Sequence, residues 1–380
     1  MDRNRQLKVN YDGKTVGTLA LYKEHIAAFQ YSEEWLAEGF SISPFSLPMS
    51  RKLFVPKVLP FDGLFGVFSD SLPDGWGRLL VDRLLLRNHI NPAELESLDR
   101  LAVVGSSGMG ALEYVPEYNF KGSRISGDLD YIAGECSRLL ATEYTESLDE
   151  LFSLGASSGG ARPKILTEFE GEPWIIKFPA PEDKKEIGRQ EYDYAVCARQ
   201  CGIEMAETRL FASKKCDGYF GTKRFDRRIS ENGNTKKIHM ISASGLLETS
   251  HRDLALDYDI LMKAALELTK DFNEVEKLYR LMCFNVFAHN RDDHAKNFSF
   301  LYDFDESRWK LSPAYDLTYS SSLWGEHATS IHGNGKDPKE EDLLAVADMV
   351  CMSRPHAEKI IRNVKSCVME MLGGISEIKL

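Results

Sequence analysis

The 380-residue chain has little of what would indicate a membrane-spanning, secreted or nucleic-acid-binding protein. No uninterrupted apolar run approaches the ~20 residues needed to cross a bilayer. The N-terminal segment MDRNRQLKVNYDGK is polar and has no apolar signal-peptide core, so a cytoplasmic location without membrane contact is expected. The net charge of −11 opposes a broad nucleic-acid-binding surface and leaves only DNA contact through a basic partner protein.

The seven cysteines include no CxxC pair. Cys197 and Cys201 lie four residues apart on an expected helix, where two thiols share a face. Because no second pair of ligands is nearby in the sequence, a zinc site is not expected there. Scattered, reduced thiols fit a cytoplasmic chain better.

What is present is the composition of an ordinary globular protein, with 43% hydrophobic and 28% charged residues. The length exceeds that of one typical core, so two or three domains or lobes are expected. Residues 6–31 predict three short strands, with a hairpin turn at Asp12-Gly13. From Asp257 onward helical periodicity dominates. A β-rich half followed by a helical half predicts a bilobal protein.

Further elements can be placed between these halves. Leucines at helical spacing predict a helix over 76–87, with Asp74 as its N-cap. A strand is expected over 111–115, and the polar segment 115–128 is a candidate domain boundary. A helix is expected from about 185 to 200.

The strongest chemical signal is the segment HNRDDHAKN at 289–297, which follows an apolar helix and precedes a strand. Asp292 and Asn297 stand in an Asp-x-x-x-x-Asn spacing, and Asp316 follows across an expected β-hairpin. Phosphoryl transfer needs one carboxylate to orient or deprotonate the attacking hydroxyl, and it needs an amide and a second carboxylate as oxygen ligands of Mg²⁺. The pattern matches a kinase catalytic loop and its metal-binding aspartate.

This segment has other interpretations. The polar residues could form no more than a solvated turn between helix and strand. Asp293 is less suited as the base, because its spacing to Asn297 is one residue short. His294 has no second histidine at metal-binding spacing, so we expect it to brace the site.

A second signal is the glycine-rich segment 155–160, which leads into two expected strands. Glycines let backbone N–H groups approach phosphate oxygens, and a lysine on a nearby strand neutralises charge. Lys177, in the apolar strand WIIKFP, is the candidate, and its alternative is a snorkelling edge residue. Glu191 either pairs with Lys177 or is only exposed. The segment GSSGMG at 105–110 lacks a following Lys-Ser or Lys-Thr helix, so we interpret it as a turn.

Together these stretches resemble the HipA family of serine/threonine kinase toxins of type II toxin–antitoxin systems. The matching segments occur in the family's order. They are SLPDGWGRLLVDR at 71–83, GMGALEY at 108–114, SSGGARPK at 157–164, WIIKFP at 174–179, TKRFDRR at 222–228, NRDDHAKNFSFL at 290–301 and SPAYDLTYS at 312–320.

The resemblance implies an α+β, kinase-like fold in two lobes with an added N-terminal subdomain. We expect a β-rich subdomain over 1–120, a kinase N-lobe with the glycine-rich loop over 121–243, and a helical C-lobe with the catalytic loop over 244–380.

The resemblance also implies roles for individual positions. Asp292 matches the catalytic base, and Asn297 and Asp316 match the Mg²⁺ ligands. Ser157, with Ser158 adjacent, matches the serine that the family autophosphorylates. The remaining positions match residues that bind ATP, at the phosphate loop, the ATP lysine, the adenine hinge and the nucleotide-lining loop: Gly159, Gly160, Ala161, Arg162, Pro163, Lys164, Lys177, Ile241, Ser242, Ala243, His294, Ala295, Lys296, Asn297, Tyr315 and Asp316.

Family membership would imply two kinds of partner. One is a small, HipB-like helix-turn-helix antitoxin, through which DNA would be contacted indirectly, and the other is a protein substrate such as an aminoacyl-tRNA synthetase. Two alternatives stay open: a small-molecule kinase of the aminoglycoside or choline type, and a non-catalytic co-repressor scaffold. The set Lys177, Asp292, Asn297 and Asp316 argues against the scaffold, and the N-terminal 120 residues argue against the small-molecule kinase.

Overall fold

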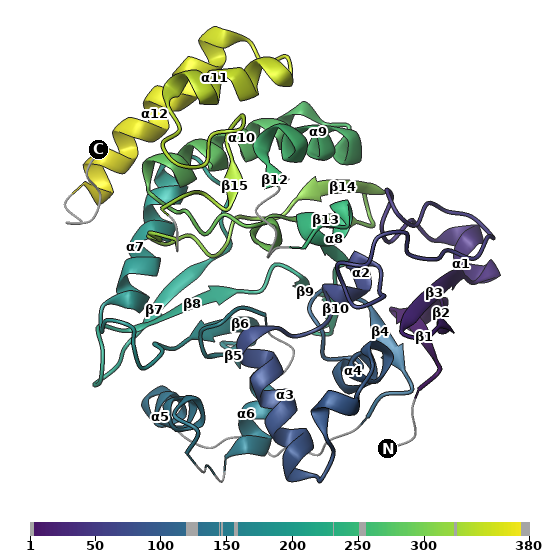
Figure 1. The fold of residues 1–380 in the computed structure, drawn as a ribbon. Helices are drawn as coiled ribbons and strands as arrows, with labels where there is room; N and C mark the ends of the chain where they lie inside the picture. Colours follow the sequence, from purple (N-terminus) through teal and green to yellow (C-terminus); the bar gives the residue numbers. More distant parts are fainter. Residues whose placement is uncertain are drawn as a thin grey trace. The chain divides into compact units, whose positions relative to one another are not determined.

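A computed structural model describes residues 4–118, 128–143, 145, 147–155, 159–230, 232–250, 256–322 and 325–373. The chain divides into two compact units (Figure 1). The first comprises Met1–Gly188 with Arg209–Ile241, and the second comprises Arg189–Thr208 with Ser242–Leu380. The chain passes from the first unit to the second within strand β11 (Met240–Ser242). Within the described residues, no helix has the length and apolarity needed to cross a membrane.

The first unit opens with an antiparallel sheet in the strand order β3-β2-β1-β4. Its strands are β1 (Gln6–Tyr11), β2 (Lys14–Lys23), β3 (Ile26–Tyr31) and β4 (Glu113–Val115). At the β1–β2 turn Asp12 and Gly13 have φ of 48° and 77°, the left-handed conformation that a tight hairpin requires. The three predicted strands and this turn are confirmed.

A second sheet of this unit has the order β5-β6-β8-β7. Its strands are β5 (Lys164–Phe169), β6 (Glu172–Lys177), β7 (Thr208–Phe211) and β8 (Tyr219–Lys223). A separate hairpin pairs β9 (Arg227–Ile229) with β10 (Thr235–Lys237). The helical elements of the unit are α1 (Glu33–Glu38), α2 (Gly66–Ser69), α3 (Gly75–Arg87), η1 (Pro92–Glu94), α4 (Ser97–Val104), α5 (Leu129–Leu140) and α6 (Leu148–Gly155).

One apolar core joins α3, α5 and α6 to the second sheet. Trp76 and Leu80 of α3 are buried against Leu151 of α6 and against Ile165 and Trp174 of the sheet. The predicted helix over 76–87 is therefore confirmed, and burial of its apolar face explains why it forms there. The predicted boundary segment 115–128 lies largely outside the described residues.

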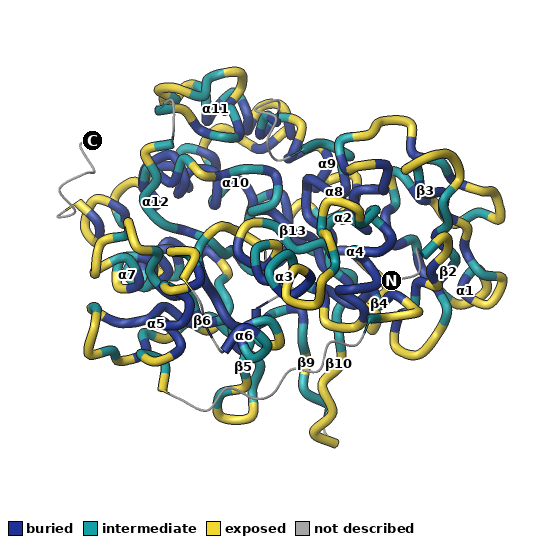
Figure 2. The backbone as a smooth tube through the Cα atoms, turned by 60° about the horizontal axis from the view of Figure 1, so that its bottom comes forward, coloured by how far each residue is buried: buried dark blue, intermediate teal, exposed yellow. Residues whose placement is uncertain are grey.

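The second unit is mainly helical. Its elements are α7 (Ile187–Gln200, from Arg189 onward), α8 (Ala243–Leu247), β12 (Leu256–Asp257), α9 (Tyr258–Thr269), α10 (Phe272–Phe287), η2 (Ala295–Asn297), β13 (Ser299–Asp303), β14 (Arg308–Leu311), β15 (Thr329–Ser330), α11 (Glu340–Met349) and α12 (Arg354–Leu372). Strands β13 and β14 form an antiparallel hairpin, and β12 pairs with β15 in parallel. Most of α10 is buried (Figure 2).

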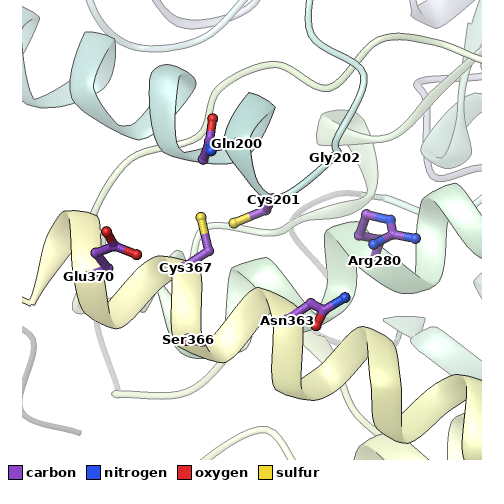
Figure 3. A pocket seen from close by; sticks show the side chains of 8 residues that line it. All are labelled: Gln200, Cys201, Gly202, Arg280, Asn363, Ser366, Cys367 and Glu370. Carbon is purple, nitrogen blue, oxygen red and sulfur yellow. The ribbon is translucent and has the colours of Figure 1, made fainter.

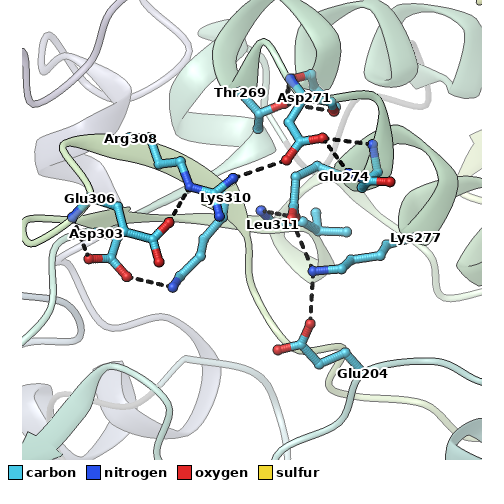
Figure 4. Close-up of polar contacts among 12 residues, drawn as sticks. Glu204, Thr269, Asp271, Glu274, Lys277, Asp303, Glu306, Arg308, Lys310 and Leu311 are labelled. Carbon is cyan, nitrogen blue, oxygen red and sulfur yellow. Dashed lines mark hydrogen bonds and ion pairs between the residues drawn. The ribbon is translucent and has the colours of Figure 1, made fainter.

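A buried carboxylate fixes α10 to the β13–β14 hairpin (Figure 4). Glu274 of α10 is only 3% exposed and accepts a hydrogen bond of 2.9 Å from the backbone N–H of Leu311, the last residue of β14. The Lys277 Nζ atom lies 3.0 Å from a carboxylate oxygen of Glu274 and 3.0 Å from a carboxylate oxygen of Glu204. A paired, hydrogen-bonded carboxylate tolerates burial. Glu274 thus holds the start of the segment that leads from β14 to Asp316.

Candidate functional site

The predicted catalytic loop begins where α10 ends. The chain turns at His289, which has φ of 52°, and then runs as an irregular segment to the short helix η2. Asn290 is buried and donates from Nδ2 to Oδ1 of Asn285 at 2.9 Å, so the loop is tied back to α10. The apolar face of α10 therefore anchors one end of the loop.

The two adjacent aspartates of this loop have opposite environments. Asp293 is fully buried, whereas the Asp292 side chain is 63% exposed. Tyr258 donates to Oδ2 of Asp293 at 3.0 Å, and Nδ1 of His327 lies 2.9 Å from the same oxygen. The backbone N–H groups of Ala328 and Thr329 donate to the other oxygen at 2.9 and 3.3 Å. Asp293 is a structural anchor, which agrees with its rejection as the base.

Asn297 folds back onto the exposed aspartate. Its Nδ2 donates to the backbone carbonyl of Asp292 at 2.6 Å, and its own N–H donates to the carbonyl of His294 at 2.8 Å. The amide oxygen of Asn297 keeps lone pairs for a cation. The imidazole Nε2 of His294 lies 4.0 Å from Oδ1 of Asp292, beside the carboxylate that it was expected to brace.

The segment that carries Asp316 is fastened to the same loop. Tyr315 donates from its hydroxyl to the backbone carbonyl of Lys296 at 2.6 Å, and the Ser299 hydroxyl lies 2.6 Å from the Tyr315 oxygen. Asp316 itself has φ of 56°, a conformation that costs energy for a non-glycine residue and clusters at functional sites. The structure thus brings together the loops of two predicted metal ligands.

Hard oxygen donors suit Mg²⁺, and Asn297 and Asp316 supply an amide oxygen and a carboxylate. The buried Oγ1 of Thr318, two residues beyond Asp316, has no hydrogen-bond partner among the described residues. This donor set fits a magnesium–nucleotide complex.

The predicted hinge residues lie at the junction of β11 and α8. Ile241 and Ala243 are fully buried, and Ser242 caps α8 by accepting a 3.0 Å hydrogen bond from Gly245. The N–H of Ala243 donates to the carbonyl of Phe298 at 2.8 Å, so this amide already has an acceptor. Contact of these three residues with adenine stays a prediction.

In the first unit, the glycine-rich segment is held by the SLPDGWG motif. The Asp74 carboxylate accepts a hydrogen bond from the N–H of Gly160, and the N–H of Trp76 donates to the Gly160 carbonyl at 2.9 Å. Asp74 occupies the N-cap position of α3, but its side chain makes no capping hydrogen bond there. The predicted N-cap position of Asp74 is confirmed, but its carboxylate accepts a hydrogen bond from Gly160 and not from the first turn of α3.

Two lysines of this unit lie opposite each other. The β5–β6 register pairs Lys164 with Lys177, which places both side chains on one face of the sheet. Lys164 is only 7% exposed and donates to the carbonyl of Gly159, and Lys177 Nζ lies 5.7 Å from the centre of the Phe220 ring. Like charges directly opposite each other repel, and a bound anion would reduce that repulsion. The pairing favours a phosphate site.

The other residues predicted to bind phosphate near the glycine-rich segment have different surroundings. Arg162 forms a bidentate ion pair with Asp183 at 2.9 and 3.1 Å, which occupies part of its guanidinium. Ala161 and Pro163 flank Arg162 in the sequence, and their contact with ATP stays a prediction. Ser157 and Ser158 lie outside the described residues. Glu191 is 4% exposed, so the reading of a merely exposed side chain is wrong.

The segment 105–110 is confirmed as a turn, and its backbone is occupied. The N–H of Gly110 donates to Asp226 at 2.8 Å, and Arg227 donates to the carbonyls of Gly108 and Gly110 at 2.9 and 2.7 Å. Burial alone would raise the pKa of Asp226, but the Arg224 and Arg227 guanidinium groups lower it to about 2. Sequence reasoning missed this buried ion cluster within TKRFDRR, although two arginines flanking an aspartate were visible.

Comparisons with known proteins agree with these features. The HipA N-terminal domain model matches residues 7–115, and the HipA-like C-terminal domain model matches residues 156–371. A curated protein of Sinorhizobium fredii (strain NBRC 101917 / NGR234), named "Putative kinase Y4mE", is 27% identical over 349 residues, which are 82% of this chain and 77% of that protein.

A solved structure shares the fold. It is HipA from the Shewanella oneidensis MR-1 toxin–antitoxin complex of HipA, HipB and operator DNA. The TM-score is 0.71 at 16% identity, and the match covers 98% of this chain and 92% of that chain. The predicted α+β, kinase-like fold class is confirmed. With both of its family domains matched in order, the chain belongs to the HipA family.

Proposed function

We propose that this chain is an ATP- and Mg²⁺-dependent serine/threonine protein kinase and the toxin of a toxin–antitoxin pair. The observation that carries the proposal is the contrast within the loop at 290–297. Asp293 is buried among four donors and fixes the backbone, while the adjacent Asp292 carboxylate is 63% exposed and reachable by a substrate hydroxyl. Phosphoryl transfer is catalysed largely by holding the reacting groups in position, and a fixed loop that presents one carboxylate suits this role.

Each residue has a role in this proposal. Asp292 accepts or orients the hydroxyl proton of the attacking serine or threonine. The amide nitrogen of Asn297 is held by the Asp292 carbonyl, so its oxygen and the Asp316 carboxylate would hold the metal ion. When bound, ATP supplies the phosphoryl group, and Mg²⁺ supplies the positive charge that neutralises the phosphate oxygens.

The first unit would bind the phosphates. Lys164 and Lys177 contribute two positive charges from one sheet face, and Asp74 keeps the chain at Gly160 in position. The opposed lysines favour an anion with more than one charge. This arrangement supports nucleotide binding more than it supports a scaffold without catalytic function.

The partners are proposed from the family. The Shewanella oneidensis HipA occurs in a complex with HipB and operator DNA, and we propose a small HipB-like helix-turn-helix antitoxin for this chain. DNA would be contacted through that antitoxin. We propose a protein substrate from translation, such as an aminoacyl-tRNA synthetase.

The test is phosphoryl transfer from labelled ATP, with Mg²⁺, to proteins of a bacterial lysate. Wild-type chain is expected to label a small number of proteins on serine or threonine. Asp292→Ala is expected to lower the rate by roughly 10²-fold or more. Asp305→Ala, which changes an exposed aspartate on the β13–β14 turn, is the matched control and is expected to keep full activity.

Two outcomes would contradict the proposal. A folded Asp292→Ala protein with wild-type labelling would remove the catalytic role of Asp292. Labelling of an aminoglycoside or choline, with no labelled protein, would favour the small-molecule kinase instead.

A further inference from the structure

Three cysteines that are distant in the sequence meet in the second unit. Cys197 lies in the last turns of α7, Cys201 directly follows that helix, and Cys367 lies near the end of α12. Their sulfur atoms all lie within 4.8 Å of one another. Among the described residues, these three cysteines form a group of side chains close enough together to share a metal ion.

Spacing along the sequence identified two of the three cysteines of this group. Cys197 lies in α7 and Cys201 directly follows its end, and the third ligand, Cys367, is 166 positions beyond Cys201. Cys367 Sγ lies 3.9 Å from the Cys197 carbonyl, a contact across a sequence separation of 170 residues. The expectation that no zinc site would form rested on the lack of further ligands nearby, and the fold supplies one.

The surroundings favour a cation at this place. Cys197 and Cys201 lie at the C-terminal end of α7, where the helix dipole is negative and stabilises positive charge. The same dipole disfavours bare thiolates, so the group is poorly suited to act as a free nucleophile. Burial accords with this: Cys197 is fully buried and Cys201 is 6% exposed.

A pocket of about 420 Å³ opens beside two of the sulfur atoms (Figure 3). Cys201 and Cys367 line it, with Arg280 and Glu370 among the other residues. In Figure 3 the sulfur atoms of Cys201 and Cys367 point toward each other across the gap between the two helices. The pocket gives a metal ion an entry path, and it leaves room for a fourth ligand such as water or the Glu370 carboxylate.

Charge balance points the same way. Three thiolates and one divalent cation carry a net charge of −1, and the Arg280 guanidinium in the same pocket is positive. Metal ligands of this type bind as thiolates, so Cys197 and Cys201 would each lose a thiol proton. Both protons would be displaced by a metal that binds sulfur.

We propose that Cys197, Cys201 and Cys367 form a site for a thiophilic divalent cation, with Zn²⁺ the natural occupant. Three Zn–S bonds form, up to three thiol protons leave to solvent, and no electron is transferred. The ion ties the end of α7 to α12 and stabilises the second unit. Zinc prefers tetrahedral coordination, so the fourth position faces the pocket.

The experiment is a Zn²⁺ titration of the reduced, tag-free full-length chain, monitored against a competing chelator. Wild-type chain is expected to bind one Zn²⁺ and to unfold at a higher temperature when the ion is present. Cys367→Ser and Cys201→Ser are expected to weaken binding by more than about 100-fold, since even outer-shell changes can cost that much. Cys351→Ser is the matched control, because Cys351 is an exposed cysteine outside the group.

Cobalt substitution gives a second readout that does not depend on stability. Co²⁺ bound by the wild-type chain is expected to show a sulfur-to-metal charge-transfer band that weakens in Cys367→Ser and persists in Cys351→Ser. Circular dichroism shows whether each variant is folded. Binding of Zn²⁺ with equal affinity by wild type and by Cys201→Ser would overturn the proposal. So would a Cys201–Cys367 disulfide that forms in air while the reduced chain binds no metal.

Discussion

The hydroxyl of Tyr315 donates to the backbone carbonyl of Lys296 at 2.6 Å and joins the two segments that carry the proposed metal ligands. A phenol has one hydrogen, so the Ser299 hydroxyl, 2.6 Å from the Tyr315 oxygen, must be the donor in that second contact. Neither bond is visible in the sequence, although Tyr315 was expected to lie by the nucleotide. The pair gives a direct test of how the site is held.

Tyr315→Phe removes both hydrogen bonds and keeps the ring. We expect a loss of about 1–2 kcal/mol in the free energy of unfolding, because each such bond contributes about 1 kcal/mol. Mg-ATP affinity should fall as well, since the Asp316 segment is no longer tied to the Asn297 loop. Calorimetry measures both. Tyr302→Phe, on β13, is the control, and unchanged Mg-ATP affinity in Tyr315→Phe would count against the tie.

The adjacent aspartates should separate activity from stability. Asp293→Ala removes a buried carboxylate and leaves Tyr258, His327 and two backbone N–H groups without their acceptor, at a cost of about 3–5 kcal/mol. Asp292→Ala, with its exposed side chain, should change the stability by less than about 0.5 kcal/mol. Chemical denaturation of both variants checks this. Equal losses of stability would show that the two environments were assigned wrongly.

Asp316→Asn should weaken Mg²⁺-dependent nucleotide binding, because an amide oxygen does not supply the charge that a hard cation prefers. The left-handed backbone at this position suits asparagine as well as aspartate, so the fold should be kept. Titration with ATP at several Mg²⁺ concentrations separates the two effects. If affinity and metal dependence both equal those of the wild type, Asp316 is no ligand.

Autophosphorylation is predicted at Ser157, with Ser158 as the alternative acceptor. A phosphate on Ser157 adds about −1.5 to −2 charges at neutral pH. Ser157 is three residues before Gly160, whose N–H donates to the Asp74 carboxylate. We expect repulsion from this carboxylate and from the nucleotide, so ATP affinity should fall after modification. Mass spectrometry of the 150–164 peptide after incubation with Mg-ATP shows the site, and Ser157→Ala is the control. A phosphorylated chain that binds ATP as before would rule out self-inhibition.

Acid should destabilise the first unit through His239. Burial lowers the pKa of His239 to about 4 from 6.5, while its Nε2 lies 2.8 Å from the Ile42 carbonyl. The unfolded chain therefore binds a proton that the folded chain does not between these values, and stability falls as the pH drops from about 6.5 to about 4. The expected loss is on the order of 1–3 kcal/mol. In His239→Gln the slope of unfolding free energy against pH should be smaller over this window, and an unchanged slope would contradict the assignment.

Local patterns in the sequence determined much of this protein. The hairpin at Asp12-Gly13, the helix over 76–87 and the β5–β6 pair follow from turn residues and periodicity within a few positions. The order of the HipA-like motifs determined the family. Such features are readable because they depend on neighbours along the chain.

Tertiary structure alone decided the environments of chemically similar residues. Asp292 and Asp293 are adjacent and of one type, yet only the second is enclosed by Tyr258 of α9 and the segment 327–329. Asp74 accepts a hydrogen bond from Gly160, which is 86 residues away in the sequence, and Cys367 contacts Cys197, which is 170 residues away. Burial and long-range partners are set by how helices and sheets share a core, and the spacing of residues along the chain carries no direct record of that.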